Sequence, residues 1–312
     1  MNKIYLLSLL AFVIIVSGCT IPGFGGGGSV QSEYENDIVI IKDQHVFPES
    51  VKASQKISLV TYVQNLAERN PDKFAVSVDL YDNCGIFSST IPKCPTTTGT
   101  TATPTGCKDI KLLPKETKEI SWTLTPDKGK VKVPIPSCKL KVAVSYPYKT
   151  VSQTEIYFID AQEARRQQEQ GTFKEKDSVP QKGEGPIVAY IIPDTNVRQP
   201  IFSDAESFPV SLYVENKGSG FLTKTADKDL SGSGIIVPDQ TAIPRATDPP
   251  CLWDQNDFKS EKITIISKKS PPYPCQLEVP SPVPRELTKR LEVTVPYTYE
   301  FRKESAVTIE PS

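Results

Sequence analysis

An internal repeat constrains the fold of this chain more than any other feature. The segment 62–65, Tyr-Val-Gln-Asn, recurs at 213–216 as Tyr-Val-Glu-Asn, 151 residues later. The alternating apolar residues of 140–148 recur at 291–299 with the same offset, and so do those at 156 and 158. Chance similarity among β-rich segments would not give one constant offset in three places. The sequence therefore predicts two copies of one domain.

Each copy has the pattern of β-strands. Phe74, Val76, Val78 and Leu80 alternate with other residues, which indicates one buried and one exposed face. In the first copy we expect strands near 37–42, 56–65, 73–82, 109–113, 117–124, 139–147 and 153–159. Seven short strands in ~120 residues are typical of an immunoglobulin-like sandwich, and a barrel is the alternative. The predicted fold class is all-β, with two tandem immunoglobulin-like β-sandwich domains related by duplication.

The first residues predict export and attachment to a membrane. Lys3 precedes an apolar run from Ile4 to Val16, and Val16-Ser17-Gly18-Cys19 follows. A positive start, a short apolar core and small residues before a cleavage site indicate a signal peptide over 1–18. The tetrapeptide resembles the lipobox of prokaryotic lipoproteins, which implies that Cys19 is lipidated. The Gly-rich stretch that follows predicts a flexible tether over 19–35. The predicted location is the outer face of the cell membrane, either extracellular or periplasmic.

The repeat and the composition place the domain boundaries. We expect domain 1 over 36–160, a linker over 161–185 and domain 2 over 186–312, with each domain folding alone. Residues 161–170 contain helix formers without an apolar stripe, which favours a short solvated helix or a frayed linker. Lys182-Gly183-Glu184-Gly185-Pro186 is predicted to break regular structure before copy two begins.

Seven cysteines predict three disulfides once Cys19 is set aside as the lipid site. Cys251 and Cys275 are the two cysteines of copy two and should pair. In copy one, Cys84 ends one expected strand and Cys138 precedes another that would be its antiparallel neighbour. This favours Cys84–Cys138, and therefore Cys94–Cys107 across the Thr/Pro-rich loop. The local pairing Cys84–Cys94 with Cys107–Cys138 is the alternative. Zinc is disfavoured because no Cys-x-x-Cys spacing occurs.

Two phrases of the sequence have a recognisable pattern: Val210-Ser211-Leu212-Tyr213-Val214-Glu215-Asn216-Lys217-Gly218 and Leu113-Pro114-Lys115-Glu116-Thr117-Lys118-Glu119-Ile120-Ser121-Trp122-Thr123. They resemble CARDB-type domains, a cell-adhesion-related immunoglobulin-like family. In that family a strand ends in Asn-x-Gly, and a later strand follows a Pro-Gly-Glu turn. Copy one departs from the pattern at Ala67, where copy two has Gly218, and at Lys115. The resemblance implies the fold and no activity. The arrangement also resembles tandem-domain surface proteins of archaea.

Residues with catalytic or metal-binding chemistry are few. His45 is the only histidine, and no Gly-x-Ser-x-Gly elbow accompanies a serine. His45 is therefore interpreted as a surface residue, and the chain as no enzyme. The turns at Asp79, Asp82 and Asn83 and at Asp254, Asn256 and Asp257 are calcium candidates, but neither has the spacing of a known loop, so no metal and no cofactor are predicted.

These observations favour a lipid-anchored cell-surface protein that acts as a non-enzymatic binding, adhesion or spacer module of the envelope. An accessory subunit of a membrane-associated enzyme or transporter complex is the alternative, and a small-molecule binder is a third class. The expected partners are the membrane, through the lipidated N-terminus, and an unknown envelope protein or glycan. The net charge of −1 gives no basic field for nucleic acid.

Overall fold

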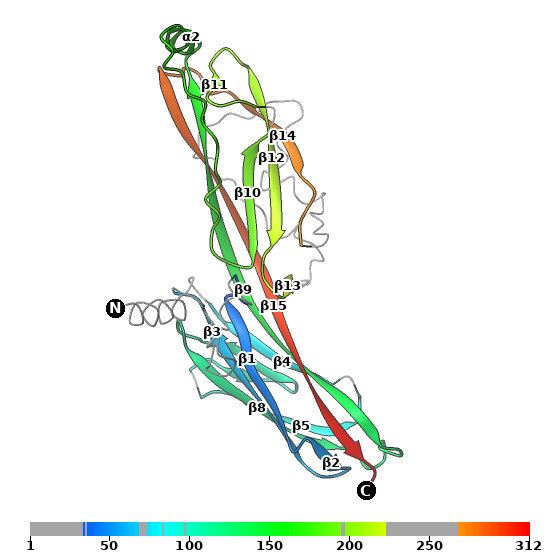
Figure 1. Cartoon of the computed structure of the whole chain (residues 1–312). Coiled ribbons are helices and arrows are strands. Elements are labelled where there is room, and N and C mark those ends of the chain that lie inside the picture. Colours follow the sequence, from blue (N-terminus) through cyan, green and yellow to red (C-terminus); the bar gives the residue numbers. More distant parts are fainter. Residues whose placement is uncertain are drawn as a thin grey trace, which may run out of the picture. The chain divides into compact units, whose positions relative to one another are not determined.

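The computed structural model describes residues 34, 36–68, 74–82, 84–96, 98–194, 197–222 and 268–312. Within these ranges nearly all regular structure is β, and it forms two sandwiches, as the sequence predicts (Figure 1). One sheet of the first sandwich has the order β1-β3-β8-β5. Its strands are β1 (Val39–Phe47), β3 (Ile57–Asn65), β8 (Thr117–Pro126) and β5 (Phe87–Lys93). Trp122 of β8 is almost fully buried in the core.

The second sandwich has a smaller sheet with the order β10-β12-β14. Its strands are β10 (Ile187–Pro193), β12 (Ser207–Asn216) and β14 (Tyr273–Glu278). Both small sheets pack against one large sheet that contains β13, β15, β9, β4, β7 and β6 in this order. These strands are β13 (Phe221–Leu222), β15 (Glu286–Glu310), β9 (Ile135–Ile159), β4 (Val76–Asp82), β7 (Gly106–Ile110) and β6 (Thr101–Ala102).

The two long strands β9 and β15 connect the sandwiches. They pair antiparallel from Ile135↔Ile309 to Ile159↔Glu286, and Figure 1 shows them side by side past both groups of strands. At ~3.3 Å per residue, a strand of 25 residues spans ~80 Å. The sequence predicts separate strands at 139–147 and 153–159, and this is wrong because β9 continues through Pro147. On the side of β9 away from β15, β4 pairs with β9 only as far as Ser145, and the next pairing is the bridge from Gln153 to Gln181. Pro147 lies between these two paired stretches. A proline is tolerated where no neighbouring strand requires its N–H.

The ladder has an approximate two-fold axis that follows from the repeat. Tyr146 pairs with Tyr299 and Tyr148 pairs with Tyr297, on either side of Pro147↔Thr298. The repeat makes Tyr297 the equivalent of Tyr146 and Tyr299 the equivalent of Tyr148. Tyr146 therefore lies opposite the repeat equivalent of Tyr148, and Tyr148 lies opposite the repeat equivalent of Tyr146. A two-fold axis through the Pro147–Thr298 pair requires this arrangement.

The tyrosines at this axis fix the first strand of each copy. The Tyr146 hydroxyl accepts a hydrogen bond from the Ile38 N–H, and the Tyr297 hydroxyl accepts one from the Ile187 N–H, both at 3.3 Å. Burial raises the pKa of both phenols, so they stay protonated and their O–H groups remain available. The Tyr297 hydroxyl also bonds to Thr150 at 3.0 Å. The two equivalent tyrosines thus have the same structural role in both copies.

Each sandwich contains the end of the other copy's long strand. At the end of β15, Ile309 pairs in parallel with Val51 of β2 (Ser50–Lys52), which belongs to copy one. At the end of β9, Phe158 pairs with Ile201 of β11 (Ile201–Phe202), which belongs to copy two. Phe158 also packs edge-on against Phe208 of β12, with ring centroids 5.7 Å apart. Whether 36–160 and 186–312 fold as separate units stays a prediction. In the structure, the last residues of each copy's long strand pair with a short strand of the other copy.

The two departures from the sequence pattern, Ala67 and Lys115, lie in two different turns. Asn65 and Asn216 each accept a hydrogen bond from the N–H two residues later, at 2.9 and 3.1 Å. A Cβ at Gly218 would overlap the Asp37 carboxylate and the Tyr299 hydroxyl, so copy two requires glycine here, whereas copy one has Ala67. Lys115 adopts φ 61°, a left-handed conformation that a glycine would adopt without strain.

Candidate functional site

A surface groove lies where the linker between the copies passes the loop after β10. The linker begins with α2 (Ala161–Glu169), whose N-cap Asp160 accepts hydrogen bonds from the N–H groups of Gln162 and Glu163 at 3.0 Å. This confirms the expectation of a short helix. After Gly171, at φ 63°, the chain returns beside β9 and forms a two-way backbone bridge between Gln153 and Gln181. The linker is therefore an ordered wall of the second sandwich.

Close packing holds the end of this linker against the long strands. A Cβ at Gly183 would overlap the Val151 carbonyl, and Gly185 adopts φ 125° beside the Tyr148 ring. The Thr150 hydroxyl donates to the Glu184 carbonyl at 3.2 Å. The segment 182–186, which the sequence predicts to break regular structure, needs its glycines because the backbone lies directly on β9.

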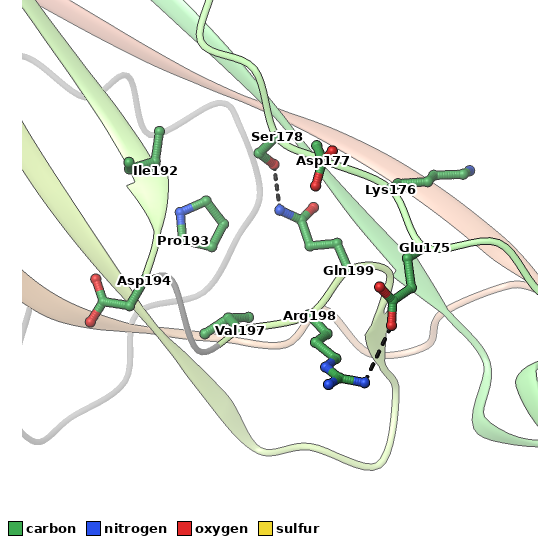
Figure 2. Close-up of a pocket in the computed structure, with 10 residues that line it drawn as sticks. All are labelled: Glu175, Lys176, Asp177, Ser178, Ile192, Pro193, Asp194, Val197, Arg198 and Gln199. Carbon is green, nitrogen blue, oxygen red and sulfur yellow. Dashed lines mark hydrogen bonds and ion pairs between the residues drawn. The ribbon is translucent and has the colours of Figure 1, made fainter.

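The first compartment of the groove has a volume of about 320 Å³ (Figure 2). Its apolar surface comes from Ile192, Pro193 and Val197. The opposite side is Gln199, which is buried and held by two hydrogen bonds. The Gln199 Oε1 accepts from the Tyr157 N–H at 3.0 Å, and its Nε2 donates to the Ser178 hydroxyl at 2.5 Å. Because both its amide oxygen and its amide nitrogen are hydrogen-bonded, Gln199 fixes the shape of this compartment.

The second compartment has a volume of about 460 Å³ and is lined mainly by apolar groups. Phe173 of the linker and Phe202 of β11 meet edge-on there, with ring centroids 6.1 Å apart. Its other lining includes Pro200, Ile201 and Ala205. Both compartments share Glu175, Arg198 and Gln199, so they are adjoining parts of one groove. We call this the linker groove.

Charged side chains surround the linker groove. Arg198 pairs with Glu175 at 3.4 Å, as the dashed line between them in Figure 2 shows. Both side chains are largely exposed. The Lys176 ammonium pairs with Glu286 at 3.4 Å and lies 4.9 Å from the centre of the Tyr157 ring. The remaining charged lining residues are Asp177, Asp194 and Asp204. The lining therefore has four carboxylates and two cations.

The structure contains two of the predicted disulfides. Cys84–Cys138 continues the register of β4 on β9, in which Asp82 lies opposite Leu140. Cys94–Cys107 joins the ends of β5 and β7, which belong to different sheets, and closes the Thr/Pro-rich loop. The favoured pairing in copy one is thus confirmed, and the local alternative is wrong. Cys19 and Cys251 lie outside the described residues, so lipidation and the Cys251–Cys275 pair stay predictions.

The other candidate residues do not assemble into a site. His45 is exposed on β1 and contacts Asp43 at 2.8 Å, which agrees with a surface histidine. Asp79 accepts a hydrogen bond from the Thr105 hydroxyl, while the side chains of Asp82 and Asn83 and the whole of 254–257 lie outside the described residues. Within the described ranges no three acidic, histidine or cysteine side chains gather as metal ligands would. In the same ranges no helix has the length and apolar character to cross a membrane.

Sequence reasoning missed the linker groove completely. Its walls come from segments about 20 residues apart, neither of which contains a catalytic or binding motif. The one available signal is the linker's own composition, in which Phe173 stands among charged residues. An isolated aromatic residue of this kind does not identify its partner, and Phe202 is found only from the coordinates.

Comparison with known proteins adds little. No family model matches the chain, and no curated protein matches it either. Among solved structures, the collagen adhesin (CNA) from S. aureus is similar with 12% identity and a TM-score of 0.14, covering 88% of this chain and 93% of that chain. A TM-score this low carries no argument about fold or function, so the fold rests on the sheets described above.

Proposed function

We propose that the protein is a lipid-anchored module on the outer face of the cell membrane, which holds a binding groove at a fixed distance from its first sandwich and performs no catalysis. The observation that carries this proposal is the β9–β15 ladder, which keeps one register from Ile159↔Glu286 to Cys138↔Val307. A spacer must resist bending between its domains, and a flexible linker alone would not provide that resistance. Here hydrogen bonds between paired strands continue through both sandwiches.

The disulfides support the proposed location. Cys84–Cys138 and Cys94–Cys107 are compatible with an oxidising compartment, where disulfides of exported proteins form and persist. The Gly-rich segment before residue 34 would then connect the lipid to the first sandwich. A diacylated cysteine gives a stable anchor, because two acyl chains hold far better than one.

The anchor is tested by replacing Cys19 with serine in the native host. Mass spectrometry of the mature N-terminus should find a lipid-modified cysteine in the wild type. After membrane fractionation, the C19S variant should be absent from the membrane fraction, or present there with its leader uncleaved. Ser29→Ala, a change within the Gly-rich tether, is the control and should leave attachment unchanged. A free, unmodified amine at Cys19 in the wild type would refute lipid anchoring.

The spacer role is tested by distance. Spin labels on unnatural amino acids at the exposed positions 128 and 165, one in each sandwich region, should give a narrow distance distribution in pulsed electron resonance. Broad distributions, as two domains on a flexible linker would give, would contradict the proposed spacer role while leaving the anchor untouched.

A further inference from the structure

The linker groove has the chemistry of a binding site for a basic and apolar ligand. Of its four carboxylates, Glu175 is paired with Arg198, and the other cation, Lys176, is paired with Glu286 outside the groove lining. Asp177, Asp194 and Asp204 have no ion-pair partner among the described residues. The groove therefore keeps an excess of negative charge that an incoming cation can neutralise.

The two compartments differ in what they can accept. The first combines Asp177 and Asp194 with a polar floor, and one Asp194 oxygen accepts from the Ser211 hydroxyl at 2.6 Å, which fixes that carboxylate. The second offers Phe173, Phe202 and Ile201 in a volume of about 460 Å³. A basic side chain fits the chemistry of the first compartment, and an aromatic side chain fits the second, where edge-on ring contacts are available.

The position of the compartments indicates an extended chain as ligand. They adjoin at Glu175, Arg198 and Gln199, so two neighbouring side chains of one ligand can enter them together. In an extended peptide, residues i and i+2 point to the same side and lie ~7 Å apart. The Glu175–Arg198 pair at the junction is exposed, and such pairs contribute little to stability, so its members can change partner on binding.

We propose that the linker groove binds an extended segment of a partner protein in which a basic residue and an aromatic residue are separated by one position. This rests on the proposed function, because it names the partner that the anchored module holds. Asp177 and Asp194 bind the basic side chain, and Phe173 and Phe202 contact the aromatic one.

The experiment uses the purified full-length chain and three fluorescein-labelled hexapeptides, measured by fluorescence anisotropy. The peptide cores are Lys-Thr-Phe, Glu-Thr-Phe and Lys-Thr-Ser. The first should bind at least about tenfold more tightly than either of the others, and its affinity should fall as salt rises. Equal binding of the three peptides, or no binding of the first, would overturn the proposal.

Variants locate the binding on the protein. Asp177→Asn is a change of an exposed side chain and should weaken the Lys-Thr-Phe peptide about tenfold without affecting the fold. Phe202→Ala should weaken it too, and far-UV circular dichroism checks that this variant still folds. Asp127→Asn, a carboxylate outside the groove, is the matched control and should bind as the wild type does.

Tight binding that Asp177→Asn and Phe202→Ala leave unchanged would place the peptide elsewhere and refute the assignment. The peptide assay does not depend on Cys19. A negative result here therefore does not contradict lipid anchoring, and a negative result in the Cys19 experiment does not contradict peptide binding.

Discussion

At Gly218, copy two has no room for a side chain, whereas copy one has Ala67 at the equivalent position. The missing side chain of Gly218 leaves room for the Asp37 carboxylate and the Tyr299 hydroxyl, and a Cβ would also lie 2.6 Å from that of Pro186. Gly218→Ala should therefore lower the free energy of unfolding by ~1–3 kcal/mol, as overpacking does. Denaturant unfolding measures this. Gly129→Ala, where the nearest atom is the flexible Asp127 carboxylate at 3.2 Å, should cost clearly less. An equal loss in both variants would contradict the packing argument.

Asp37 joins the start of copy one to the turn after β12. Its carboxylate accepts hydrogen bonds from the Ser219 N–H at 3.1 Å and from the Ser219 hydroxyl at 2.6 Å, and it is only 3% exposed. Burial raises its pKa, against the lowering effects of Ser219, Lys268 and Tyr299. An acid with a raised pKa in the folded state binds its proton more tightly when folded, so stability is lost as pH rises from ~4 through the folded pKa.

Asp37→Asn should remove this pH dependence while keeping an acceptor oxygen for Ser219. Relative to the wild type, the variant should gain stability as pH rises above ~4 and reach a constant difference once the folded-state carboxyl has ionised. Denaturant unfolding of both proteins between pH 3 and 7 measures the difference. A difference that does not change with pH would show that Asp37 titrates as it does in the unfolded chain.

The two disulfides stabilise the strands that they join, and the loops that they close differ in length. Cys84–Cys138 closes a segment with a sequence separation of 54, and Cys94–Cys107 one of 13. In the chain-entropy model the longer loop contributes more, ~4 against ~3 kcal/mol. Replacing each pair with serines and measuring urea unfolding should give losses in that order. If the loss of Cys94–Cys107 is the larger, its link between the two sheets matters more than loop length.

Strand prediction succeeded where alternation was clear and failed where proline interrupted it. The strands near β3, β4 and β8 follow from their buried-exposed patterns. β5 was missed because Pro92 lowers strand propensity, which an edge strand tolerates. Pro147 likewise concealed the continuity of β9. The disulfide pairing was predictable because it depends on which strands are neighbours, whereas the linker groove depends on contacts between segments that no periodicity links.

The whole molecule is expected to unfold as one unit. The sequence predicts two domains that fold alone, but Phe158 of copy one packs on Phe208 of copy two, and Ile309 of copy two pairs with Val51 of copy one. Calorimetry should therefore give a single transition. Phe158→Ala should move that transition to lower temperature as a whole, with a loss of ~3–5 kcal/mol. Two transitions, of which the variant shifts only one, would restore the picture of independent domains.

The shared ladder also limits how the chain can change length. A shift of one residue in a strand turns every following side chain to the opposite face of its sheet. In β9 or β15 such a shift would reach both cores, because each strand begins in one sandwich and ends in the other. Insertions and deletions are therefore restricted to the loops and the strand ends, and an alteration in the middle of either strand must be matched by one in its partner.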